Sequence, residues 1–343
     1  DCLLSRGLGD VYKRQTKHIN PAEKGPAMFE ASSSTRLSAS APLDREGAQL
    51  IRRPRPKRQR TALSFEIIPP RPTDDPEKID QLIAGLAEYK PDYVSVTSSR
   101  RSEWLEGTAA VISRISETTD LRTIAHLACT AGTRDEMAEW VRVLIDAGVR
   151  GFLALRGDLP EEGLPADHLQ YATDLLNLIQ DVQEEEAFRL AAGKLALSVA
   201  CYPKGHEESR NFDHDLDVLL TKQRLGADFA ITQLFFEAQD FLEFVEVARL
   251  AGVRIPLIPG IMPMTSLKRV RRMGELSGLE VPVGVEKQLL EADNEYEAGM
   301  QLTANLAREI LDAGAGGLHV YTHNNLHVTR DFLDRIGIDK GQQ

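Results

Sequence analysis

From residue 61 onward, short apolar runs alternate with amphipathic stretches that are long enough to form helices. The apolar runs are rich in Val, Ile, Leu and Ala at consecutive positions, a pattern typical of parallel strands that are buried on both faces. We predict strands at residues 62–68, 93–97, 123–128, 152–155, 196–201, 229–232, 256–259 and 317–321. Helices are predicted between these strands, among them 76–89, 134–147, 171–183, 213–225, 238–251 and 266–276.

Eight strand–helix repeats favour a closed barrel over an open, doubly wound sheet, since such barrels typically take roughly 250 residues. Gly148 and Gly226 fall just after predicted helices, where a residue with positive φ is wanted. No GxGxxG motif follows a predicted strand, which disfavours the dinucleotide-binding alternative. We therefore predict an α/β fold, a single-domain (β/α)8 TIM barrel over residues 61–338.

Residues 1–60 lack this periodicity. From Met28 to Arg60 the chain is rich in Ser, Ala and Arg, a composition that predicts a disordered N-terminal segment. The letters DVYKRQ at 10–15 resemble the translation of a sequencing adaptor, which points to residues 1–15 as an artefact and to Met28 as the start. We interpret the basic run at 52–58 as part of a solvated tail rather than as a nucleic-acid or lipid contact.

Charge and cysteine content exclude several functions. The 343-residue chain has a formal net charge of −11, which argues against a nucleic-acid partner for the folded part. It contains no apolar run of about 18 residues, so no membrane partner is expected. Cys2, Cys129 and Cys201 show no CxxC spacing, so we predict a reduced, cytoplasmic protein with neither a disulfide framework nor a metal site.

Polar residues follow most of the predicted strands at their C-terminal ends, where TIM barrels carry their active sites. In chain order these residues are Glu66, Thr97, His126, Arg156, Asp158, Tyr202, His206, Gln233 and Tyr321. A single strand-end carboxylate or histidine is often a paired structural group. Seven strands that bring polar groups to one rim are better explained by a functional site.

Seven short motifs, in this order and at these strand ends, resemble the methylenetetrahydrofolate reductase family over residues 64–336. They are SFEIIPP (64–70), AHLAC (125–129), LRGD (155–158), YPKGH (202–206), AITQLFF (230–236), PGIMP (259–263) and GLHVYT (317–322). The resemblance implies reduction of 5,10-methylenetetrahydrofolate to 5-methyltetrahydrofolate, which feeds methionine synthesis. It also implies FAD as cofactor and NADH or NADPH as hydride donor.

The resemblance assigns the proton-donor role to Glu66. Its apolar neighbours Phe65, Ile67 and Ile68 suit this role, because burial raises the pKa of a carboxylic acid. A barrel glutamate paired with a basic neighbour is the structural alternative. The resemblance places Asp158 near the flavin and the pterin, where its charge would stabilise a cationic folate iminium.

The resemblance also implies two sets of binding residues and no metal ligand. The flavin set is Thr97, His126, Arg156, Gly157, Asp158, Tyr171, Ala172, His206, Asp215 and Lys222. The folate set is Glu66, Gln233 and Tyr321. Arginine suits phosphate through its bidentate fork, although an ion pair with Asp158 or a helix glutamate is the alternative for Arg156. Phe235 and Phe236 are interpreted as core residues.

Two departures from the family pattern bear on the flavin. The run TSSRRSEW at 97–104 keeps Thr97 but lacks the glycines usual in that loop. On the helix after strand 5, Val218 and Thr221 stand where the family commonly has Asn and Arg, so Asp215 and Lys222 must carry more of the flavin contacts. The losses predict weaker flavin binding, since each hydrogen bond contributes roughly 0.5–3 kcal/mol.

Three alternatives remain at this level. The same reaction could run without flavin, with hydride passing directly from the nicotinamide to the folate. A non-redox pterin-binding barrel methyltransferase would need pterin contacts but no hydride donor. A folate-binding protein without catalysis would have little use for a buried acid such as Glu66. The expected partners are the folate and the nicotinamide cofactor, and assembly into a homo-oligomer stays open.

Overall fold

The computed structural model describes residues 61–98, 104–190, 193–206 and 208–341. Its strands all pair in parallel in one sheet, in the order β7-β6-β5-β4-β3-β2-β1-β9-β8. The strands are β1 (Ala62–Ile67), β2 (Tyr93–Val96), β3 (Thr123–Ala128), β4 (Gly151–Leu155), β5 (Ala196–Cys201), β6 (Phe229–Thr232), β7 (Leu257–Ile258), β8 (Gly260–Ile261) and β9 (Gly317–Tyr321).

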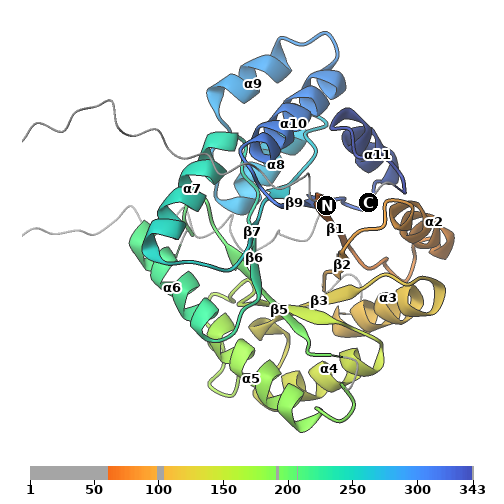
Figure 1. Ribbon diagram of the computed structural model, residues 1–343, viewed down its shortest axis with the longest axis vertical. Helices are drawn as coiled ribbons and strands as arrows, with labels where there is room; N and C mark the ends of the chain where they lie inside the picture. Colours follow the sequence, from red (N-terminus) through yellow and green to blue (C-terminus); the bar gives the residue numbers. More distant parts are fainter. Residues whose placement is uncertain (1–60, 99–103, 191–192, 207, 342–343) are drawn as a thin grey trace, which may run out of the picture. The chain divides into compact units, whose positions relative to one another are not determined.

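Helices follow the strands and surround the sheet, as Figure 1 shows. They are α2 (Pro76–Ala87), α3 (Trp104–Thr118), α4 (Arg134–Asp146), α5 (Ala172–Glu185), α6 (Phe212–Arg224), α7 (Ala238–Ala251), α8 (Leu267–Ser277), α9 (Val283–Leu290), α10 (Glu295–Asp312) and α11 (Leu326–Arg335). A short 3-10 turn, η2 (Cys129–Ala131), follows β3. Three helices, α8, α9 and α10, lie between β8 and β9, and α10 packs against both α7 and α11 in the ring of helices.

The barrel closes through a strand that a proline divides. Leu257–Ile258 pair with β6 and Gly260–Ile261 pair with β9, so β7 and β8 are two halves of the seventh strand. Pro259 has no N–H to donate to a ladder, but its carbonyl accepts a hydrogen bond from the His319 amide at 2.9 Å. The pairings therefore run in a ring, and the predicted TIM barrel is confirmed.

Alternation along the strands separates two buried layers. In β1, Leu63, Phe65 and Ile67 belong to the main hydrophobic core between sheet and helices. Ser64 and Glu66 point to the other side, into the barrel, since successive side chains of a strand face opposite ways. In β1 the face inside the barrel is therefore polar, and the face toward the helices is apolar.

Local signals set several helix ends. Thr133 and Glu136 form a reciprocal capping box at the start of α4, and the Ser266 side chain caps α8 by accepting the Arg269 amide. Gly148 and Gly226 have φ of 101° and 83°, as predicted from the sequence. Most predicted strands match within one residue, and the seventh differs because of its proline.

The predictions for residues 1–60 lie outside the described residues, as does the loop segment 99–103. The described barrel elements run from Ala62 to Arg335. The division of the chain at residue 60 therefore stays a prediction.

Candidate active site

Glu66 is an acid held inside the barrel near the C-terminal end of β1. Its side chain is 14% exposed, and its Oε2 lies 3.9 Å from Nε2 of His126 on β3. Burial raises the pKa of Glu66 from 4.5 to about 8. Glu66 is therefore protonated at neutral pH and can give up a proton there.

His126 is neutral beside this acid. The residue is 8% exposed, and burial lowers its pKa to about 4. Since neither partner is charged between about pH 4 and pH 8, their contact is not an ion pair at neutral pH, and the alternative of Glu66 as half of a structural salt bridge is not supported. Nε2 of His126 has no hydrogen-bond partner among the described residues.

Tyr321 frames Glu66 from the neighbouring strand. The two residues stand opposite each other in the β1–β9 register, and the Tyr321 hydroxyl donates to the Thr232 carbonyl at 2.7 Å. The ring lies so close to Gly260 that an added Cβ there would meet the hydroxyl at 2.6 Å. Glycine in β8 is thus required for Tyr321 to cross the barrel mouth.

The barrel interior also holds a polar pair, an aromatic stack and a small apolar cluster. Ser64 Oγ lies 2.8 Å from Nδ1 of His319, and the rings of Tyr93 and His319 stack with centroids 6.1 Å apart. Ile124, Leu153 and Ile231 form a separate small apolar cluster on the inner face. The cluster closes the interior toward the N-terminal ends of the strands, so the barrel opens toward Glu66.

Two hydroxyls, one in β2 and one just past its end, are buried without partners. Ser95 Oγ and Thr97 Oγ1 have no hydrogen bond within the described part of the chain. Buried polar atoms are normally paired, and an unpaired one often marks a place where a ligand or water binds. The structure ends β2 at Val96, one residue earlier than predicted, so Thr97 lies just past the strand.

A second group of predicted residues meets at the rim after β4 and β5. The Arg156 guanidinium lies over the Tyr171 ring, 5.0 Å from its centroid, and its Nε donates to the Gln170 carbonyl at 3.1 Å. It also forms an ion pair with Glu208. The alternative of an ion pair is thus realised, with a loop glutamate rather than Asp158 or a helix residue.

His206 and Asp215 join this rim group. The His206 amide donates to Asp215 Oδ2 at 2.9 Å, and Ser209 donates to the other carboxylate oxygen. Nδ1 of His206 accepts the Glu208 amide at 3.1 Å. Asp215 therefore organises the loop between β5 and α6.

Lys222 lies apart from the rim, deeper between α6 and β5. It is 8% exposed, and its ammonium donates to the Ala200 carbonyl at 3.1 Å. Burial lowers its pKa, and the nearby charge of Asp215 opposes this shift. Asp215 and Val218 on the same helix are half-buried, so the predicted common face runs from the rim into the interior.

Asp158 stands exposed at the barrel rim after Gly157. The surrounding protein still desolvates its carboxyl group in part and raises its pKa. Gly157 has a φ of 84°, and an added Cβ would meet Thr130 Oγ1 at 2.3 Å. Glycine is favoured here by the positive φ and by the close approach of Thr130.

The remaining predicted residues lie at their expected strand and helix ends. Gln233 follows β6 and uses its Oε1 to accept the Leu234 amide at 2.9 Å. Ala172 begins α5 and is buried. Phe235 and Phe236 are buried in the main core, as predicted.

Tyr202, one of the strand-end polar residues, belongs to the rim group, although it was assigned to neither the flavin set nor the folate set. Its ring meets the His206 ring edge-on at 4.5 Å. Burial raises its pKa, with smaller contributions from Asp215 and Glu208. Its position directly after β5 was a usable signal, whereas nothing in the sequence marks Glu208 as the partner of Arg156.

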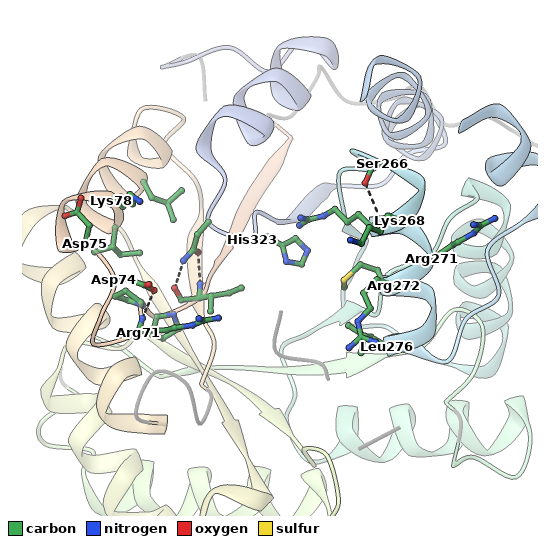
Figure 2. A pocket seen from close by; sticks show the side chains of 18 of the residues that line it. Arg71, Asp74, Asp75, Lys78, Ser266, Lys268, Arg271, Arg272, Leu276 and His323 are labelled. Carbon is green, nitrogen blue, oxygen red and sulfur yellow. Dashed lines mark hydrogen bonds between the residues drawn. The ribbon is translucent and has the colours of Figure 1, made fainter. Parts of the chain in front are cut away.

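One cavity borders the loop that follows β1, and Glu66 itself does not line it. It has a volume of about 1600 Å³ and is lined by the loop after β1, by α2, by α8 and by the loop after β9. Figure 2 shows its two walls, with His323 between them. Its lining begins at Ile68, two residues after Glu66. Within the described residues there is no cluster of side chains that could hold a metal ion and no helix that could span a membrane.

The sequence profile of the family described as methylenetetrahydrofolate reductase matches residues 51–337. The chain belongs to this family. A curated relative from Salmonella typhimurium, named 5,10-methylenetetrahydrofolate reductase, is 32% identical over 284 residues, 81% of this chain and 92% of the relative. A relative of the same name from Pectobacterium carotovorum is 31% identical over 283 residues, 81% of this chain and 91% of the relative.

One solved structure also shares the barrel, with a TM-score of 0.58 and 16% identity over 80% of this chain and 93% of the other. It is described as an uncharacterized protein from Clostridium thermocellum that binds two copies of 5-methyl-5,6,7,8-tetrahydrofolic acid. At this identity the likeness concerns the fold alone. All candidate residues from Glu66 to Tyr321 fall within the methylenetetrahydrofolate reductase match.

Proposed function

We propose that this protein reduces 5,10-methylenetetrahydrofolate to 5-methyltetrahydrofolate, with NADH or NADPH as hydride source and FAD as cofactor. The observation that carries the proposal is a protonated carboxylic acid, Glu66, inside the open end of the barrel. Membership of a folate-linked reductase family supports the choice of substrate.

The chemistry explains why an acid is needed. Reduction requires the five-membered ring of the folate to open to an iminium, and the leaving nitrogen must take a proton as the ring opens. Glu66 would supply this proton at neutral pH because its pKa is about 8. The carboxylate that remains would be stabilised by a hydrogen bond from His126, in the tautomer that carries the proton on Nε2. Asp158 at the rim would attract the cationic iminium.

FAD fits part of the site as it stands. Thr97 and His126 offer buried polar atoms that lack partners among the described residues, and Arg156 with Tyr171 forms a cationic and aromatic rim. These residues, with Gly157, Ala172, His206, Asp215 and Lys222, would hold the cofactor. FAD held there would supply a carrier for the hydride between the nicotinamide and the folate.

A second version, without flavin, is favoured by specific contacts. Glu208 occupies the Arg156 fork, and the Lys222 ammonium is bound to the Ala200 carbonyl. Val218 and Thr221 also offer no amide or guanidinium on α6. For FAD to bind through Arg156, Glu208 must turn away from it.

The test is an absorbance spectrum and a coupled assay on the purified protein. We expect a yellow protein that oxidises NADH or NADPH only when methylenetetrahydrofolate is present. A colourless protein with the same activity would support the flavin-free version. No folate-dependent oxidation of either nicotinamide would contradict the proposal and favour a methyltransferase or a binding protein.

We also propose that the reaction takes place in the cytoplasm. Cys129 and Cys201 are both buried and unbridged, as is usual for proteins of reducing compartments. Assembly into a homo-oligomer stays a prediction.

A further inference from the structure

The ladder that joins the first and last strands of the barrel ends at the acid. The last pair in the β1–β9 register is Glu66 with Tyr321. The chain then leaves β1 through Ile68, and Pro69 and Pro70 follow. Because proline has no N–H to donate, Ile68 is the last residue before the two prolines that can be held through both its N–H and its carbonyl.

Two side chains of the loop after β9 hold the end of β1 beyond the ladder. Thr322 Oγ1 donates to the Glu66 carbonyl at 2.5 Å. The Ile68 amide donates to Asn324 Oδ1 at 2.9 Å, and Asn324 Nδ2 donates to the Ile68 carbonyl at 2.6 Å. An asparagine side chain offers a donor and an acceptor, as a peptide group does. Asn324 therefore continues the pairing of β1 for one more step past Glu66.

The turn that carries these side chains has a backbone suited to present them. His323 and Asn324 have φ of 47° and 57°, in the left-handed region that His and Asn adopt more readily than most residues. The Asn324 amide donates to Thr322 Oγ1 at 3.1 Å. The next residue, Asn325, caps α11 by accepting the Val328 amide at 3.1 Å. Two adjacent asparagines thus have different partners, because Asn324 holds β1 and Asn325 begins α11.

The place of the Glu66 carboxyl group depends on how the end of β1 is held. Its Oε2 lies 3.9 Å from Nε2 of His126. A small rotation of the strand end would change both the direction of the acid and its exposure to water. Asn324 is exposed at the rim, whereas Thr322 is only 3% exposed. Loss of the Asn324 amide should therefore leave the folded barrel intact while it loosens the strand end.

We infer that Asn324 and Thr322 are positioning residues for Glu66, which fix the end of β1 so that the acid stays inside the barrel and aimed at the ligand. The role of the acid itself rests on the proposed function. Exact placement matters, because a shift of about 1 Å in a reacting group can lower a rate on the order of 10²-fold. A turn that only connects β9 to α11 would need the cap by Asn325 and no contact with β1.

The pH dependence of the reaction should report these contacts. Burial raises the pKa of Glu66 to about 8. Among the described residues, the titratable groups that face it are His126 from β3 and Tyr321 from β9, and its register partner on β2, Ser95, does not titrate. Since neither titratable neighbour is charged at neutral pH, exclusion of water sets this pKa. A loosened strand end admits water and lowers the pKa toward 4.5.

The test compares Asn324→Gly with Asn325→Gly, a matched control in the same turn. Glycine removes the side chain in both variants, adopts a positive φ and is accepted at a helix N-cap. We expect Asn324→Gly to lower kcat about 10- to 100-fold and to leave the KM for the nicotinamide unchanged. The alkaline limb of its kcat/KM profile should move to lower pH by about one unit or more. Asn325→Gly should keep the wild-type kcat and profile, and circular dichroism should show both variants folded.

Thr322→Val is a second, independent variant, because valine keeps the shape of the side chain but cannot donate to the Glu66 carbonyl. It should show the same fall in kcat and the same shift in the profile, whereas Thr322→Ser, which retains the hydroxyl, should restore both. Wild-type kcat and profile in Asn324→Gly and Thr322→Val would overturn the inference. So would an equal loss in Asn325→Gly, or a loss confined to the KM for the folate, which indicates substrate contact instead.

Infrared difference spectroscopy separates this inference from the proposed function. The band of the protonated Glu66 carboxyl group is identified by its loss in Glu66→Gln, and its titration needs neither turnover nor ligand. We expect a midpoint near pH 8 in the wild type and a lower one in Asn324→Gly and Thr322→Val. That result supports the positioning role even if no reductase activity is found. An unchanged midpoint in both variants of an active reductase would reject the positioning role alone.

Discussion

Glu66 combines two properties that rarely occur together, a buried carboxyl group and no charged partner. The only basic side chain paired with it in the described residues is His126, which is itself neutral because burial lowers its pKa to about 4. Desolvation by the barrel is the cause of the raised pKa of Glu66. The same burial that makes it a useful acid also makes it costly to the folded state.

Glu66→Gln should remove most of the folate reduction, because glutamine keeps the shape of the side chain but has no proton to give. We expect a loss of about 10²–10⁴-fold in kcat, the usual contribution of a general acid. Wild-type kcat/KM should fall about tenfold per pH unit above pH 8, as Glu66 loses its proton. Steady-state assays check both, with exposed Glu184→Gln on α5 as control. A variant that keeps a tenth of wild-type turnover would show that Glu66 is not the acid.

The same substitution should stabilise the fold, increasingly so as pH rises. The folded pKa of Glu66 lies above its unfolded value of 4.5, so wild type loses stability between pH 4.5 and pH 8 as the unfolded chain ionises. At pH 7 the cost is about 3 kcal/mol, at about 1.4 kcal/mol per pKa unit. Glutamine does not titrate and avoids it. Urea unfolding at pH 5 and pH 8 measures the difference, and a gap that stays constant or narrows with pH would contradict the raised pKa.

At the scale of elements, α6 and β5 form one unit around a buried lysine. Lys222 extends from α6 to the Ala200 carbonyl near the end of β5, while Asp215 at the other end of α6 holds the loop of His206. The position of each residue along α6 therefore decides whether it can reach a ligand at the rim. Asp215 lies at the rim, and Lys222 lies beneath it.

Lys222→Met tests whether this helix carries the flavin. Methionine preserves the buried apolar stem, so the fold should remain, whereas the lost ammonium should lower flavin occupancy at least several-fold. The ratio of flavin to protein absorbance measures this, and added FAD should restore part of the activity. Arg224→Met is the control, since Arg224 is exposed on the same helix. A yellow and fully active Lys222→Met protein would exclude the lysine from the cofactor site.

The whole molecule is held by the closed ring of strands and the helices around it. Its first strand pairs with its last, as Ala62 to Glu66 run beside Gly317 to Tyr321. This pairing brings Glu66 and Tyr321 together across some 250 residues of chain. The barrel thus depends on residues from about 61 onward.

A chain that begins at Gln59 should therefore melt within about 2 °C of the full chain and turn over folate at the same rate. The composition of residues 1–58 offers too little apolar surface to offset the entropy of ordering them. Differential scanning calorimetry and the coupled assay measure the two properties. A drop of 5 °C or more, or a clear loss of rate, would show that the segment packs on the barrel.

The fold and the family could be predicted because their signals are local. Parallel strands buried on both faces produce continuous apolar runs, and Gly148 and Gly226 end helices for backbone reasons alone. The strand-end motifs keep their order whatever the loops between them do. Pro259 was the exception, because its missing N–H divides a strand only in the context of the ladders on both sides.

The sequence by itself determined the barrel, the family and the candidate acid. Only the tertiary structure decided that Glu66 is uncharged, that Glu208 pairs with Arg156, that Lys222 is buried against β5, and that six basic residues line one cavity. The physical reason is that burial and electrostatic interactions are sums over neighbours from distant segments. A hydrophobic pattern records which face of a strand is buried, but not which side chains meet there.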